Sequence, residues 1–204
     1  AGVDNRDLTA SFSSPVSLDS LTRAFGAMGA IAAAQMETYT IKADTLFGVL
    51  PCFALDIRGG RSNLVNDILA PDKMSLRSFA VSAGKDSTLT FDGYVLGFDT
   101  GSMRLDSIYI NAGQHDDHLH LTAGVLNRPG NLDSWHAATL KARVDGNEAA
   151  LRLSQSDIKG RTGYDLGIAA TADSSFTFHI RPVDPVIAYQ NWTANDDNYI
   201  TYTV

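Results

Sequence analysis

Between about Leu76 and Ile180, apolar and polar residues alternate through one short segment after another. Successive side chains of a β-strand point to opposite faces of a sheet, so a period of two predicts strands with one apolar and one polar face. Turn-forming residues separate the segments, and Asp145-Gly146 between two alternating runs is a strong hairpin signal. The pattern therefore predicts an antiparallel meander of roughly eight strands.

The acidic residues agree with this prediction. The chain has 23 Asp and Glu residues, and only Glu37 and Glu148 among them are Glu. Asp favours caps and turns, whereas Glu favours helices. Most of the Asp residues fall at the expected hairpin turns or on the polar faces of strands, which leaves few of them for acid–base catalysis.

The first 75 residues mix strands with helices, and we treat 1–75 and 76–204 as two parts of one continuous sheet. Apolar residues at spacings of three and four predict a helix over 17–34, with Ser17 as its N-cap and Asp19 in its first turn. We expect this amphipathic helix to pack on the sheet. The other expected elements are strands over 8–12, 37–47 and 53–57, a helix over 64–69 that Pro71 ends, and a final strand over 199–204.

The apolar face of such a meander needs a cover. The fold class expected is mainly β with one or two helices, in which the sheet curves into an open groove or closes partly into a sandwich. The residues expected to line this groove or core are Leu105, Ile108, Ile110, Leu119, Leu121, Leu140, Val144, Leu151, Leu153, Leu166, Ile168, Phe176 and Phe178.

Composition excludes several classes of protein. A net charge of −7 argues against a nucleic-acid surface, which needs clustered Lys and Arg. The single cysteine, Cys52, excludes an internal disulfide and a cysteine zinc site, and we expect it to be buried. The longest apolar stretch, 24–34, is too short for the roughly 20 residues of a membrane-spanning helix. Membrane attachment is therefore expected only through segments outside this chain.

One cluster contains the residue types that bind metals: His115, Asp116, Asp117, His118 and His120. Imidazoles with a carboxylate can hold zinc. A polar turn followed by two His residues on the wet face of a strand explains the same pattern, and we expect no metal and no cofactor.

Catalytic motifs are lacking. The sequence has no Gly-x-Ser-x-Gly elbow and no His-Glu-x-x-His motif. Adjacent carboxylates such as Asp116-Asp117 and Asp196-Asp197 are expected by chance in so Asp-rich a chain, so a hydrolase based on them is a minor hypothesis. The aromatic residues that could instead form a sugar-stacking surface are Trp135, Trp192, Tyr189 and Tyr199.

Three features resemble the TamB family of the AsmA-like superfamily, especially its Bacteroidetes-type members. These are the ladder of short amphipathic strands over 76–180, the hairpin sequence Gly-Arg-Thr-Gly-Tyr at 160–164, and the ending Arg-Pro-Val-Asp-Pro…Asn-Tyr-Ile over 181–200. The resemblance covers about the last 130 residues well. The helix over 17–34 departs from the plain β-ladder of the family.

The resemblance implies a periplasmic protein of the Gram-negative cell envelope, without catalytic residues. It implies an apolar β-groove that carries lipid between membranes or helps to assemble outer-membrane proteins. The expected partners are acyl chains or phospholipid, and an outer-membrane barrel protein. The alternative hypothesis is a surface module, built as a β-sandwich, that binds a glycan through Trp135 and Trp192 or binds a protein.

Overall fold

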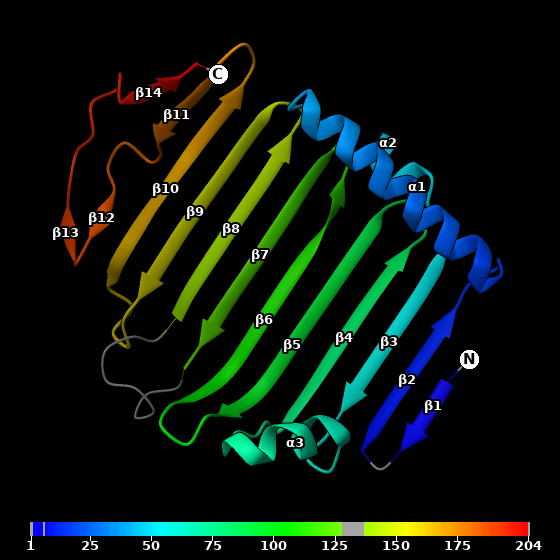
Figure 1. The fold of residues 1–204 in the computed structure, drawn as a ribbon. Coiled ribbons are helices and arrows are strands. Elements are labelled where there is room, and N and C mark those ends of the chain that lie inside the picture. Colours follow the sequence, from blue (N-terminus) through cyan, green and yellow to red (C-terminus); the bar gives the residue numbers. More distant parts are fainter. Residues whose placement is uncertain (1, 6, 128–136, 204) are drawn as a thin grey trace.

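The computed structural model describes residues 2–5, 7–127 and 137–203, and side chains from residue 7 onward. Its strands form one open antiparallel sheet in which nearly every strand pairs with its neighbour in the chain, in the order β1 to β11 and then β14 (Figure 1). The short β12 and β13 lie beside this path, where β12 pairs with β10. The predicted meander is confirmed.

The strands are β1 (Gly2–Asn5), β2 (Leu8–Ser13), β3 (Phe53–Gly59), β4 (Ser78–Lys85), β5 (Leu89–Asp99), β6 (Arg104–His115), β7 (His118–Leu126), β8 (Ala137–Asp145), β9 (Glu148–Ser156), β10 (Thr162–Ala172), β11 (Phe176–Ile180), β12 (Val186–Ile187), β13 (Gln190–Asn191) and β14 (Tyr199–Tyr202). The helices are α1 (Leu18–Glu37), α2 (Ala43–Gly48), α3 (Leu64–Leu69) and the 3₁₀ turn η1 (Ala70–Asp72). The pairing of β3 with β4 joins the parts 1–75 and 76–204 into one sheet.

Helix α1 begins and runs as its sequence predicts. The backbone N–H of Ser20 donates to Oγ of Ser17 at 3.3 Å, and Asp19 lies in the first turn. The helix extends to Glu37, three residues further than predicted. Its 20 residues give a length of about 30 Å. At roughly 4.8 Å between strands, this length spans about six strand intervals.

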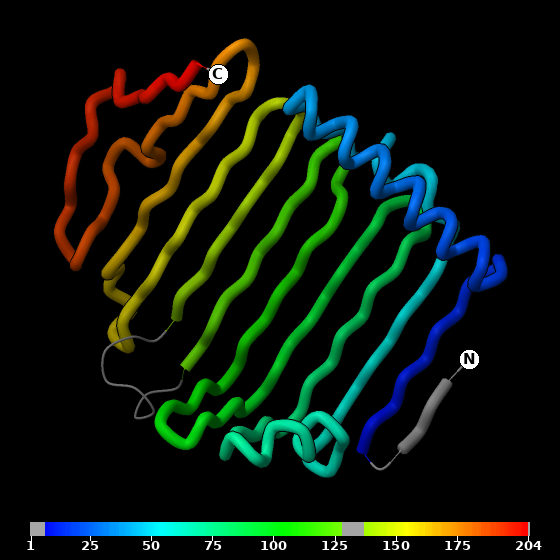
Figure 2. Tube along the Cα trace, in the orientation of Figure 1, coloured from blue at the N-terminus to red at the C-terminus, as the bar shows by residue number. Residues whose placement is uncertain are grey.

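Figure 1 shows that α1 crosses the ends of the strands along one rim of the sheet. Figure 2 shows the same arrangement along the chain trace, with α1 at one rim and α3 at the opposite rim. The rings of Phe25 in α1 and Phe53 in β3 lie 6.1 Å apart. The expected packing of this helix on the sheet is therefore realised at the strand ends rather than across the middle of a face.

The predicted strand over 37–47 is wrong. The chain leaves α1 through Tyr39, which has a positive φ of 51°, forms a single bridge between Ile41 and Gly146, and enters α2 at Ala43. Tyr39, Ile41 and Ala43 alternate as in a strand, but they mark a connection between two helices. Ala43 is fully buried where α1 and α2 meet, and this tertiary contact overrides the local pattern.

At the other rim, Asn63 and Asn66 fix α3. The side chain of Asn63 accepts hydrogen bonds from the N–H groups of Val65 and Asn66, which caps the helix. The Asn66 amide both donates to and accepts from the backbone of Leu76, each at 2.9 Å. The predicted helix over 64–69 is confirmed, and η1 with Pro71 ends it. The described residues thus form three α-helices where one or two were expected.

Cys52 is exposed, contrary to the prediction that it is buried. It lies just before β3, where its Sγ approaches the carbonyl oxygen of Asp86 at 3.8 Å, and the apolar side chains of the strand begin only at Phe53.

Little of the apolar surface is buried within the described part of the chain. The buried hydrophobic residues are Leu21, Ala43, Leu46, Leu50, Leu76 and Leu105, so the small core lies beside the helices and near the rims. Large side chains in the middle of the sheet stay exposed, such as Leu151 at 46% and Ile168 at 48%. The sheet is an open layer with little of its surface covered.

We predict that Leu46→Ala lowers the free energy of unfolding by about 2–4 kcal/mol, since it leaves a cavity in a packed site. Leu151→Ala should cost about 1 kcal/mol or less, because nearly half of this side chain is already in water. Urea unfolding followed by circular dichroism measures both. Equal losses would show that Leu151 lies in a closed core and would contradict the open layer.

Candidate functional site

The register aligns the apolar side chains of neighbouring strands into rows that run across the sheet. In the longest row each residue pairs with the next, and none is polar. The row comprises Phe12, Leu55, Ala83, Phe91, Ala112, Leu121, Ala142, Leu151, Ile168 and Ile180, one from each strand from β2 to β11. Large and small residues alternate through much of it, which leaves hollows over the alanines.

A second row runs beside the first. It comprises Ala10, Ile57, Val81, Gly93, Ile110, Ala123, Leu140, Leu153 and Leu166, from β2 to β10. We call the side of the sheet that carries these two rows the apolar face. The opposite side, which carries the intervening residues of each strand, is the polar face. Antiparallel sheets commonly separate their two faces in this way.

Successive residues of a strand alternate between the two faces. Twelve of the thirteen residues predicted to line the groove or core occupy apolar-face positions, from Ile108 on β6 to Phe178 on β11. Leu105 is the exception. It pairs with Phe98 and lies two residues before Ser107, so both have polar-face positions on β6. It is buried near the rim, so its place is in the small core and not among the rows.

Two cavities lie on the apolar face below the helices. Phe47 of α2 overhangs a cavity of about 280 Å³ whose floor includes Leu89, Phe91, Leu119 and Leu121. The second cavity, of about 360 Å³, lies between Met36, Tyr39 and Ile41 and strands β8 to β11. Both cavities contact Val144, so they adjoin. The ring of Tyr39 meets that of Phe176 edge-on at 4.7 Å.

The sequence analysis missed Phe47, Met36 and Tyr39 as residues of this face. Phe47 and Tyr39 were placed in a strand, and Met36 beyond the end of the helix. The apolar residues Ala43, Leu46, Phe47 and Leu50 follow the spacing of three and four that is typical of a helix. This spacing could have placed Phe47 on a helix.

One row of the polar face changes its charge from one side of the sheet to the other. This cross-strand row comprises Ser11, Asp56, Ser82, Asp92, Asn111, Thr122, Lys141, Arg152 and Gly167. Its carboxylates lie on β3 and β5, and its cations lie on β8 and β9. Arg152 donates two hydrogen bonds to Asp165 at 2.7 and 2.6 Å, and these hold the pKa of that carboxyl below its usual range.

The cluster at 115–120 has a structural use. The carboxylate of Asp117 accepts the backbone N–H of Asp44 at 3.0 Å, and Asp44 itself accepts from the side chain of Gln114. Because no side chain of α2 caps its own first turn, the β6–β7 hairpin supplies the missing acceptor. His120 contacts Oδ1 of Asn111 at 3.2 Å. The described residues contain no group of His, Cys, Asp and Glu arranged to hold a metal ion.

The aromatic residues considered for glycan binding are spread out. Trp192 is 54% exposed, and the ring of Tyr199 lies 5.3 Å from that of His179 on β11, tilted by 56°. Tyr189 lies under the guanidinium of Arg161 at 5.3 Å. Trp135 lies outside the described residues. Within the described chain there is one sheet and no second one packed on it, so the sandwich of the alternative hypothesis is not found there.

Comparisons with models of protein families, with curated protein sequences and with solved structures gave no match. Among the described helices, none has the length and apolar character needed to cross a bilayer.

We predict that Asp117→Ala destabilises the protein by about 0.5–2 kcal/mol, the range found for loss of a helix cap. Asp116→Asn is the matched control, since Asn tolerates the positive φ of that position and Asp116 does not cap α2. Thermal unfolding measures both variants, and adding Zn²⁺ to the wild type should leave the midpoint unchanged. A midpoint raised by zinc and lost with His118→Ala would contradict the structural role.

Proposed function

We propose that this chain is a non-catalytic module whose apolar face binds the acyl chains of lipids. The observation that carries the proposal is the uninterrupted apolar row from Phe12 to Ile180, which crosses ten strands. Leu151, Ile168 and Ile180 of this row are exposed, and its other seven residues are only half-buried. At about 4.8 Å per strand the row is about 43 Å long. Soluble monomers rarely leave a contiguous apolar area of this extent without a ligand or partner.

Acyl chains suit this surface for a physical reason. The apolar face offers no polar group along its two rows, so it cannot select a ligand by hydrogen bonds. A flexible hydrocarbon needs no such bonds, and each methylene removed from water contributes roughly 0.8 kcal/mol. The hollows over Ala112 and Ala142, between larger neighbours, form a path along which an acyl chain can cross the strands.

The resemblance to the TamB family supports a more specific proposal about where the module acts. On that proposal the protein belongs to the periplasm of a Gram-negative envelope and carries lipid between membranes, or assists outer-membrane protein assembly with a barrel partner. The open meander and its apolar face agree with the groove that the family implies. The helices at the rim are a feature that the resemblance did not include.

We predict that the purified chain binds a fluorescent fatty acid saturably. Ile110→Gln and Leu151→Gln should each weaken this binding at least fivefold, since each places an amide on the apolar rows. Ser107→Gln, on the same strand as Ile110 but on the polar face, is the matched control and should bind as the wild type does.

Two results would contradict the proposal. One is the absence of saturable binding by the wild type, and the other is an equal loss in Ser107→Gln and Ile110→Gln. In cells, photocrosslinkers at Leu121 and Leu151 should form adducts with phospholipid. Adducts with protein alone at both positions would instead support a protein-binding face.

A further inference from the structure

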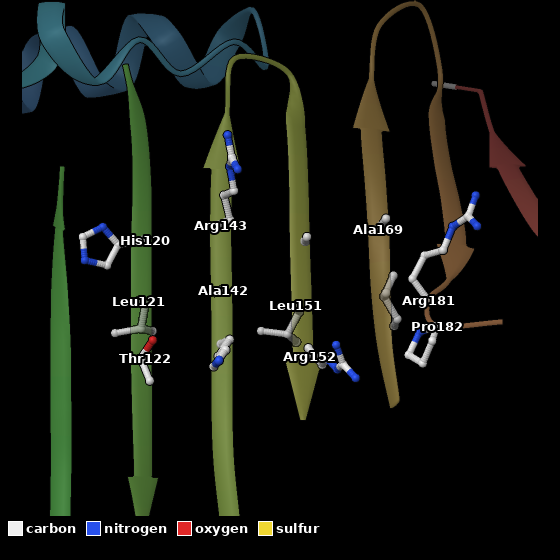
Figure 3. Close-up of a pocket in the computed structure, with 13 residues that line it drawn as sticks. His120, Leu121, Thr122, Ala142, Arg143, Leu151, Arg152, Ala169, Arg181 and Pro182 are labelled. Carbon is white, nitrogen blue, oxygen red and sulfur yellow. The ribbon is translucent and has the colours of Figure 1, made fainter. Parts of the chain in front are cut away.

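The polar face carries a hollow that the acyl-chain proposal does not use. It has a volume of about 440 Å³ and lies over strands β7 to β10 (Figure 3). Its walls come from two cross-strand rows of the polar face, one through His120, Arg143 and Ala150 and the other through Thr122, Lys141 and Arg152. Residues between these rows, such as Ala142 and Leu151, also line the hollow, although they alternate with the polar-face residues along their strands.

The charge of this hollow is opposite to that of the whole chain. Four cations line it, Lys141, Arg143, Arg152 and Arg181, and none of its lining residues is a carboxylate. The protein as a whole has a net charge of −7. A concentration of positive charge in an acidic protein attracts anions locally, because nearby charges dominate the potential within about 8–10 Å.

Two of the four cations are held by carboxylates outside the hollow. Arg143 pairs with Asp145 at 2.6 Å, and Arg152 makes its two hydrogen bonds to Asp165. Lys141 and Arg181 form no ion pair or hydrogen bond through their side chains with any described residue. Lys141 lies directly opposite Arg152 on the neighbouring strand, an arrangement of like charges that destabilises a sheet. A bound anion between them would remove that repulsion.

The backbone is shaped to bring Arg181 to the hollow. Its N–H donates to the carbonyl of Gly167 at 2.9 Å, which fixes the end of β11 beside β10. A Cβ on Gly167 would lie 2.5 Å from the carbonyl oxygen of Leu151 and 2.6 Å from that of Arg181. Only glycine therefore permits this approach. Ala150 and Ala169, with small side chains, leave the space open.

An adjoining hollow of about 420 Å³ shares Arg143, Ala150, Ala169 and Arg181 with the first. His179 lines it, and Nδ1 of His179 is buried without a hydrogen-bond partner. Leaving a buried polar atom unpaired costs free energy. Asp145 and Glu148 lie at the far side of the adjoining hollow and keep the positive region to one end.

We infer that the polar face binds a phosphate group, as a phosphate monoester or diester, between Lys141, Arg152 and Arg181. The guanidinium of Arg181 can donate two parallel hydrogen bonds to phosphate oxygens, and Lys141 adds a point charge. Arg152 keeps its hydrogen bonds to Asp165 through Nε and Nη2 and contributes its remaining N–H groups. Lys141 and Arg152 have polar-face positions on their strands, opposite the acyl-chain rows, so phosphate binding does not depend on the function proposed above.

Inorganic phosphate and glycerol 3-phosphate are the probes, with binding measured by NMR titration of the full chain. We expect saturable binding that Lys141→Gln and Arg181→Gln each weaken at least tenfold. Arg181→Lys should keep most of it. Lys73→Gln removes the same charge from the residue that follows η1, at the α3 rim, and should bind as the wild type does.

Absence of saturable binding by the wild type would overturn the inference, and so would an equal loss in Lys73→Gln. Lys141 is exposed and makes no contact through its charge, so Lys141→Gln tests the site even if Arg181→Gln unfolds. The phosphate could belong to a lipid headgroup or to a soluble ester. Comparing binding to vesicles of phosphatidylglycerol with binding to vesicles of phosphatidylcholine distinguishes these two sources. Binding of the anionic vesicles with the same dependence on Lys141 assigns a lipid headgroup, and phosphate binding without vesicle binding assigns a soluble ester.

Discussion

The antiparallel backbone ladder is the interaction on which the rest of this structure depends. From β2 to β11 each strand pairs with the next in a register that keeps apolar residues opposite apolar residues. A slip of one residue between β8 and β9 would place Leu151 and Leu153 among Lys141 and Arg143 and would interrupt both rows. The hairpin turns, such as Asp145-Gly146, therefore keep both apolar rows intact, because they set the register between neighbouring strands.

An open sheet with distinct faces can support two kinds of chemistry that do not interfere. Apolar rows cover one side and a band of cations lies on the other, with the backbone between them. The helices lie mainly at the rims, where they bury Leu46 and Leu50 and form the cavities beside Phe47 and Tyr39. Residues in the middle of the apolar face, such as Leu151 and Ile168, are left accessible, so the described sheet does not close over them into a core.

Local pattern predicted the strands well because the period of two extends over several residues in each, as in Leu119 to Val125. It predicted α1 from its cap and its stripe of apolar residues. It failed at 37–47, where Tyr39, Ile41 and Ala43 alternate by coincidence across a link between two helices. Leu105 was assigned to the set of lining residues by its type, although its parity along β6 is that of Ser107.

The sequence by itself determined that this chain forms an amphipathic meander, since alternation and turn residues are local properties. It also identified part of the apolar face, from Ile108 on β6 to Phe178 on β11. Only the tertiary structure decided that this face stays open, because cover depends on where helices come to lie and not on their propensity to form. The cation hollow was equally hidden, since Lys141, Arg152 and Arg181 come together only through the pairing of four strands.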